Sequence, residues 1–207
     1  MNGDILICVV VGYLCGSIPF GLILTKMVGG ADIRTIGSGN IGATNVLRTG
    51  RKSLAAATLI LDAAKGAFSI FIVSLFLSKA VLADAYLGIV AGSAVIGHCY
   101  PVWLKFSGGK GVATGLAVIT MLSPISGILF IATWILVAYI MKYSSLAALT
   151  AFASSSISAL ILENNEISIA IIFITLLAFF RHTENINRLL SGEESKISTS
   201  SRPKSKN

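Results

Sequence analysis

The sequence predicts an all-α integral membrane protein, a seven-transmembrane-helix bundle with the N-terminus outside and the C-terminus in the cytoplasm. Three observations support this fold class. Of the 207 residues, 55% are hydrophobic and only 12% are charged, which is about half the charge of a soluble domain. Seven apolar runs follow one another along the chain. The basic residues fall almost entirely on one side of these runs.

The apolar runs predict the helices in chain order. The first, 4–28, is long enough to cross a bilayer, because a crossing needs roughly 20 helical residues. The second, 53–78, is longer and can tilt, and the third, 85–103, also reaches the required length. The fourth, 112–122, is short and stops at Ser123, so we expect other helices to shield its end. The last three runs cover 125–142, 145–162 and 166–180.

The positive charges predict the orientation of the bundle. If the N-terminus is outside, every Lys and Arg falls on the inner side except Lys65, within a span, and Lys79, which faces out. This asymmetry is what the positive-inside rule predicts. The outer side then receives Asp4, Asp84, Glu163 and Glu166.

The chain divides into one membrane domain and a tail. Residues 1–194 contain all the apolar runs, whereas 195–207 are rich in Ser and Lys and are predicted to be disordered. The three cysteines have no metal-ligand spacing and are interpreted as small buried hydrophobes.

The first inner loop contains a glycine-rich motif that favours binding of an anion. Glycines permit positive φ and let backbone N–H groups converge on a phosphate. A nearby arginine can bind that phosphate with two prongs. The alternative is a flexible loop with an interfacial arginine. The residues concerned are Gly37, Ser38, Gly39, Asn40, Gly42, Thr44, Asn45 and Arg48.

A second motif lies just before the short fourth run. Gly108, Gly109, Lys110 and Gly111 precede an expected helix N-terminus, where unpaired N–H groups favour negative charge. The motif is not a nucleotide-binding Walker loop, because Leu104 stands where its first glycine would be. The alternative interpretation is a tight turn between helices.

Further polar residues follow the last run or lie inside spans. His182 and Asn185 share one helix face, and Arg188 follows them. Asp62 and Lys65 lie within the second run at a spacing that permits an ion pair, which is either structural or in contact with substrate. His98, near the inner end of the third run, is interpreted as a structural residue that bonds a loop, and His182 also has a structural alternative.

Together these motifs predict a site for one or two phosphate-bearing substrates on the cytoplasmic face. Metal chemistry is disfavoured, because Asp62 is the only acidic residue within a span.

Several longer strings occur in one order along the chain. They are Gly16–Gly21, Asp32–Arg34, Gly37–Arg48, Leu61-Asp62 with Lys65-Gly66, Gly97-His98 with Pro101–Phe106, Gly108–Gly115, and Arg181-His182 continuing to Glu194. In these strings the chain resembles the bacterial acyl-phosphate:glycerol-3-phosphate acyltransferases, the PlsY family. The resemblance covers nearly the whole chain up to Glu194.

The resemblance implies a seven-helix bundle in the bacterial inner membrane, without metal, nucleotide or coenzyme and without nucleic acid as a partner. It implies acyl transfer from acyl phosphate to glycerol 3-phosphate, giving lysophosphatidic acid in phospholipid synthesis. A soluble phosphate acyltransferase would make the donor. Ser38 and Arg48 are implied as essential, Lys110 and its glycines as the phosphate-binding loop, and His182 and Asn185 as active-site residues. Glu194 is implied to be structurally important.

Two other functions and one mechanistic question stay open at this stage. A transporter for small anions would need cationic residues near the membrane midplane, and a headgroup phosphotransferase would need several carboxylates for metals. The proton acceptor is either His182 or a substrate phosphate. We favour the phosphate, because the sequence places no carboxylate to orient the imidazole of His182.

Overall fold

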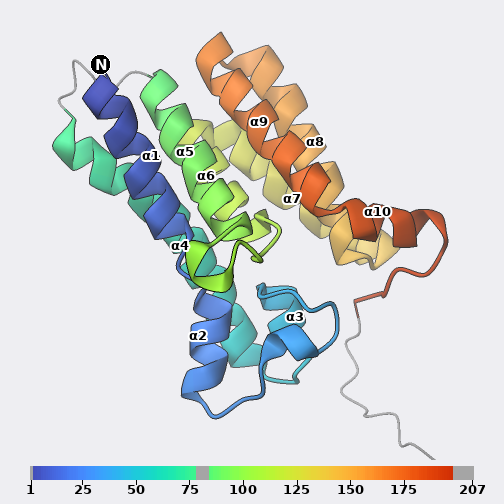
Figure 1. The fold of residues 1–207 in the computed structure, drawn as a ribbon. Helices are drawn as coiled ribbons and strands as arrows, with labels where there is room; N and C mark the ends of the chain where they lie inside the picture. The colour runs from blue at the N-terminus through green and yellow to red at the C-terminus, as the bar shows by residue number, and fades with distance from the viewer. Residues whose placement is uncertain (1, 78–83, 198–207) are drawn as a thin grey trace, which may run out of the picture.

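The protein, described here from a computed structural model, is helical in every regular element of the residues covered, 2–77 and 84–197 (Figure 1). This confirms the predicted all-α class. The helices are α1 (Asn2–Gly16), α2 (Phe20–Met27), α3 (Ala43–Leu47), α4 (Lys52–Phe76), α5 (Asp84–Cys99), α6 (Val112–Leu122), α7 (Pro124–Met141), α8 (Ser144–Leu162), α9 (Asn165–Arg181) and α10 (Thr183–Leu190), with 3₁₀ turns at Ile33–Thr35 and Val102–Leu104.

The helices match the apolar runs closely, but their lengths alone do not give seven crossings. Five segments of the described chain are long and apolar enough to span a membrane: Gly3–Met27, Lys52–Phe76, Asp84–Leu104, Pro124–Met141 and Ser144–Leu162. A sixth arises if α9 and α10, bent by 61°, count together. Helix α6 has 11 residues, about 16 Å, against roughly 30 Å of hydrocarbon. Seven crossings and the orientation of the termini therefore stay predictions, and Lys79 lies outside the described residues.

The first run is broken between α1 and α2, where Pro19 has no N–H to continue the helix. At this break the carbonyl of Ile18 accepts from the N–H of Phe20 at 3.2 Å and from the ammonium of Lys65 of α4 at 2.7 Å. Lys65 also lies 2.8 Å from the Oδ1 atom of Asp62, which confirms the predicted ion pair. This pair therefore fixes the break in the first span against the second.

Small residues allow close packing in the middle of the bundle. Helix α1 packs on α4 and α5, α5 on α9, and α7 on α8. A Cβ atom at Gly97 would overlap the carbonyl oxygen of Tyr13, so only glycine permits this approach of α5 to α1. Large apolar side chains such as Tyr139 and Phe76 are exposed on the outside of the bundle, as expected for a surface in contact with lipid.

The predicted motifs meet at one end of the molecule. The N-terminus of α1 lies at one end of the bundle, and α2, α3, the loop between α5 and α6, and α10 lie toward the other (Figure 1). A small apolar cluster packs the loop around α3 onto α2 and α4; it consists of Leu22, Ile33, Ile41, Val46 and Ala55. The polar loops thus rest on a rigid support.

Candidate active site

Asn45 organises the first glycine-rich loop. Its amide nitrogen donates to the carbonyls of Ile33 at 2.7 Å, Ile36 at 3.0 Å and Asn40 at 2.8 Å. Its Oδ1 atom accepts from the backbone N–H of Ser38 at 3.1 Å. The side chain is buried, and an amide has only two hydrogens. The loop therefore uses the donors of Asn45 itself, which corrects the expectation that Asn45 offers them to a phosphate.

The glycines of this loop determine the backbone conformation, and their N–H groups are used within the loop. Gly37 has φ +57° and Gly39 has φ +67°, as predicted, but Gly42 has an ordinary negative φ. The N–H of Gly39 donates to the carbonyl of Ile36, and the N–H of Gly42 to the Oδ1 atom of Asn40 at 2.9 Å. These two N–H groups form turns within the loop. They do not converge on an anion, contrary to the prediction from the sequence.

Ser38, Thr44 and Arg48 are candidate site residues that this loop leaves exposed. Arg48 follows α3 and lies against Gly37, because a Cβ atom there would come 3.0 Å from its Nη1 atom. Its Nη2 atom donates to the hydroxyl of Ser195 at 2.6 Å. The guanidinium is thus held at the loop surface, where a phosphate can approach it.

The second loop is bonded to the end of α5. The N–H groups of Gly108 and Gly109 donate to the carbonyls of Cys99 at 3.1 Å and His98 at 3.0 Å. Gly111 has φ +79° and caps α6, a conformation that suits glycine. The amides of Gly108 and Gly109 are therefore committed to the fold, and the ammonium of Lys110 is the charged donor of this loop.

Lys110 lies in a network with Asn185 and Glu194. The ammonium of Lys110 donates to the Oδ1 atom of Asn185, whose Nδ2 atom donates to Glu194 at 2.8 Å. Glu194 also accepts from Arg188 at 2.8 Å and from Ser145 at 3.0 Å. Burial lowers the pKa of Lys110 to about 8. The positive charge of Arg188 also lowers this pKa, whereas the carboxylate of Glu194 raises it.

We expect replacement of Glu194 to loosen this network. Burial would raise the pKa of Glu194, but hydrogen bonds from Arg188, Asn185 and Ser145 lower it below the ordinary value of 4.5. Because the folded pKa is the lower one, the stabilisation is present above pH 4.5 and is lost as the pH falls through the folded value. Glu194→Gln should lower stability by about 1–3 kcal/mol at neutral pH.

Thermal unfolding in detergent measures this change between acid and neutral pH. The Gln variant should show less loss of melting temperature on acidification than the wild type. Glu193→Gln is the matched control, since Glu193 is exposed and accepts from Ser191 at 3.3 Å. Equal melting temperatures for both variants would show that the network contributes no stability.

His182 lies buried at the bend between α9 and α10. Its Nδ1 atom is 2.7 Å from the carbonyl oxygen of Ala178. A carbonyl only accepts, so Nδ1 carries the hydrogen and Nε2 of the neutral ring is an acceptor. The sequence predicted no carboxylate partner for this imidazole. The structure orients it with a main-chain carbonyl instead.

A buried polar cluster lies beneath the second loop. His98 Nδ1 is 3.8 Å from Asp62 Oδ1, and both residues are almost completely buried. Thr114 of α6 donates to the main-chain carbonyl of Asp62 at 2.7 Å. A Cβ atom at Gly109 would overlap the ring of His98. The cluster thus supports the loop from below, which agrees with the structural interpretation of His98.

The site residues form two groups. Lys110, His182, Asn185, Arg188 and Glu194 gather around α10, whereas Ser38 and Arg48 belong to the loop around α3. Residues 194–197, which we call the strap, connect the groups. Ser195 accepts from Arg48, Lys196 lies over Tyr143, and Ile197 donates its N–H to the carbonyl of Lys142 at 2.7 Å. Residues 195–197 of the expected disordered tail therefore make contacts, and 198–207 lie outside the described residues.

Three residues in these contacts were not predicted. Ser195 lies 147 positions from Arg48, Ser145 lies 49 positions from Glu194, and Arg181 lies 72 positions from Gly109. A serine in an apolar helix and an arginine at the end of a span are common and carry no local signal. Only the position of Arg181 beside His182 marked it in the sequence.

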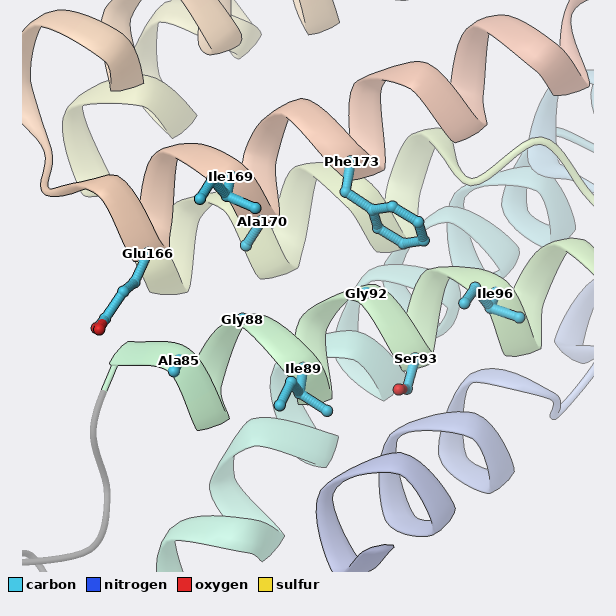
Figure 2. Close-up of a pocket in the computed structure, with 10 residues that line it drawn as sticks. All are labelled: Ala85, Gly88, Ile89, Gly92, Ser93, Ile96, Glu166, Ile169, Ala170 and Phe173. Atoms are coloured by element: carbon cyan, nitrogen blue, oxygen red, sulfur yellow. The ribbon is translucent and has the colours of Figure 1, made fainter. Parts of the chain in front are cut away.

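A groove of about 480 Å³ between α5 and α9 is separate from these groups. Figure 2 shows Ala170 and Phe173 of α9 facing Gly88 and Gly92 of α5, and a Cβ atom at either glycine would come against these side chains. Its polar side chains are Glu166 and Ser93. The groove contains no predicted site residue.

Comparison with known proteins follows the same motifs. The sequence model of the family described as glycerol-3-phosphate acyltransferase matches residues 6–192. The glycerol-3-phosphate acyltransferase of Sinorhizobium medicae (strain WSM419) is 52% identical over 193 residues, 93% of this chain and 92% of the relative. That of Rhodospirillum rubrum is 50% identical over 194 residues, 92% of this chain and 90% of the relative.

Two solved structures share the fold. Both are crystal structures of PlsY (YgiH), an integral membrane glycerol 3-phosphate acyltransferase, one in its glycerol 3-phosphate form and one in its lysophosphatidic acid form. The TM-scores are 0.86 and 0.85, with 36% sequence identity over 94% of this chain and 96% of the other.

Proposed function

Because the chain belongs to the glycerol-3-phosphate acyltransferase family, we propose that it transfers an acyl group from acyl phosphate to the 1-hydroxyl of sn-glycerol 3-phosphate. The products are 1-acyl-glycerol-3-phosphate (lysophosphatidic acid) and phosphate. The observation that carries the proposal is the placement of Lys110. Its ammonium bonds Asn185 next to the start of α6, where a phosphate is favoured by charge and by unpaired N–H groups.

The reaction makes modest demands on the protein. The oxygen of the primary hydroxyl bonds to the acyl carbon, and the bond from that carbon to the phosphate oxygen breaks. The hydroxyl proton passes to a phosphate, so the products are an ester and hydrogen phosphate. Phosphate is a good leaving group, so the site must neutralise two phosphates and align the hydroxyl with the carbonyl.

Different residues of the site bind the phosphates, align the acceptor and position Lys110. Lys110 and Arg48 bind the phosphates, Arg48 with a two-pronged guanidinium. Ser38 lies on the same loop with an exposed hydroxyl and helps to align the acceptor. Asn185 positions the ammonium of Lys110, because its amide connects Lys110 to Glu194.

We place the reaction at the cytoplasmic face of the bacterial inner membrane, with the N-terminus outside. The support is the charge asymmetry of the loops and the clustering of all three motifs at one end of the bundle (Figure 1). A soluble phosphate acyltransferase that makes acyl phosphate would then deliver the donor from the same side.

A detergent assay tests the function directly. Purified protein receives acyl phosphate and glycerol 3-phosphate with a chelator present, and we expect 1-acyl-glycerol-3-phosphate to form. With no membrane barrier, product formation excludes a transporter, and with chelator present it excludes a metal-dependent phosphotransferase. Acyl-coenzyme A in place of acyl phosphate should give no product, and product from it would contradict the proposed donor.

His182→Asn tests the proton acceptor. We expect the variant to raise KM while keeping kcat within about tenfold, because Asn can replace one hydrogen bond to substrate and a substrate phosphate takes the proton. Loss of a true general base would instead cost roughly 10²–10⁴ in kcat. Steady-state kinetics across pH distinguish His182 as the general base from a substrate phosphate as the proton acceptor. A limb of the profile that vanishes in the variant, with large kcat loss and unchanged KM, would make His182 the base.

A further inference from the structure

Arg181 binds the two carbonyls that precede Lys110. Its Nε atom donates to the carbonyl of Gly109 at 3.1 Å, and its Nη2 atom to the carbonyl of Gly108 at 3.2 Å. Two parallel donors on successive carbonyls fix both the position and the orientation of this short peptide segment. Because the opposite N–H groups of the same glycines are bonded to the end of α5, the backbone before Lys110 is held from both sides.

The guanidinium of Arg181 is itself held in place. It lies 4.9 Å from the centroid of the Tyr100 ring, a distance typical of cation–π attraction. The carbonyl of Tyr100 accepts from the hydroxyl of Tyr13 at 2.8 Å, which ties this support to α1. No salt bridge in the described part of the chain neutralises Arg181 with a carboxylate. Its positive charge therefore adds to that of Lys110.

Lys110 is consequently fixed at two points by the same pair of helices. Its backbone is held through Gly109 by Arg181, the last residue of α9, and its ammonium is held by Asn185 of α10. The 61° bend between α9 and α10 separates these two contacts. The two contacts together restrict the ammonium of Lys110 to one position.

We propose that Arg181 is a positioning residue of the phosphate site: by binding the Gly108 and Gly109 carbonyls it fixes the place at which Lys110 meets a substrate phosphate. This inference rests on the proposed function for the identity of the substrate. The contacts themselves do not depend on which phosphate compound binds.

Arg181→Gln and Arg181→Lys test the proposal. Gln keeps a donor without charge, and Lys keeps the charge without two parallel donors. For Gln we expect KM for the phosphate substrates and the inhibition constant for inorganic phosphate to rise about tenfold or more, since charge-assisted hydrogen bonds are lost. We expect a smaller rise for Lys and a kcat change within about threefold for both.

A matched control and a double variant make the test decisive. Arg51→Gln removes another arginine that donates to a carbonyl, that of Val28 at 3.3 Å, far from Lys110 in the sequence, and should leave kinetics unchanged. If Arg181 acts through Lys110, adding Arg181→Gln to Lys110→Ala should cause little further loss of kcat/KM. Losses that multiply would overturn the proposal, because Arg181 would then act independently.

Other outcomes are equally informative. A lower melting temperature with unchanged KM and unchanged phosphate inhibition would make Arg181 purely structural. If the Gln variant does not fold, the Lys variant decides, and wild-type kinetics for it would overturn the role of the paired donors. If the wild type transfers no acyl group, the proposed function fails. Binding of inorganic phosphate by calorimetry to wild type and Arg181→Gln then still tests the positioning role.

Discussion

Lys110→Ala is expected to lower kcat/KM for acyl transfer by about 10²-fold while the protein still folds. The substitution removes the charge that we propose binds the substrate phosphate and the donor that orders Asn185, and hydrogen bonds to charged groups contribute about 1.5–3 kcal/mol each. The loss should appear mainly in KM. Kinetics and thermal unfolding in the same detergent measure both effects.

The pKa of Lys110 adds a pH test. Since that pKa is lowered to about 8 by burial first of all, the ammonium loses its proton as the pH rises through about 8. KM for the phosphate substrates should therefore rise above pH 8 in the wild type, and Lys110→Arg should remove this rise because arginine stays charged. Lys52→Ala, an exposed lysine at the start of α4, is the control. Early melting with unchanged kinetics for Lys110→Ala would favour the interpretation of the loop as a simple turn.

Arg48→Lys is expected to raise KM for a phosphate substrate and to lower kcat/KM by about 10²-fold. The charge stays, but the two-pronged geometry is lost, and this geometry is what distinguishes arginine at a phosphate. Arg34→Lys provides a control in the same loop, since the Nη2 atom of Arg34 pairs with the Oδ2 atom of Asp32 at 2.6 Å. Equal kinetics for wild type and Arg48→Lys would contradict the two-pronged role.

Ser195→Ala distinguishes the contact of Arg48 with Ser195 from its proposed contact with a substrate phosphate. The variant keeps the arginine but removes the acceptor on the strap, and we expect a change in kcat/KM of less than about threefold, because a substrate phosphate is a stronger acceptor than a hydroxyl. A loss as large as that of Arg48→Lys would show that Arg48 acts through the strap and does not bind substrate itself.

The helices of this protein could be read from the sequence because their cause is local. An apolar run must bond its own backbone in lipid, so the fourth run, 112–122, is helix over the same residues. The ion pair between Asp62 and Lys65 also follows from spacing on one helix. The number of crossings does not follow in this way, because the short α6 and the bent α9 depend on what surrounds them.

The site was only partly predictable because residue type does not say where a donor is used. Asn45 was expected to bind a phosphate, yet three carbonyls of its own loop take its amide. Those partners exist only after Gly37 and Gly39 turn the chain. Arg181 was not assigned a role, since its partners Gly108 and Gly109 lie about 70 residues earlier and the direction of their carbonyls is a product of tertiary structure.

The position of the strap in the sequence has a consequence for the order in which the site is assembled during synthesis. Glu194 and Ser195 follow every other site residue in the chain and join the loop around α3 to α10. During synthesis from the N-terminus, the two groups of site residues are therefore made and inserted before the segment that connects them. A nascent chain that ends before Glu194 would lack the carboxylate that accepts from Asn185 and Arg188, so the group of residues around α10 should be less stable until translation has passed Glu194.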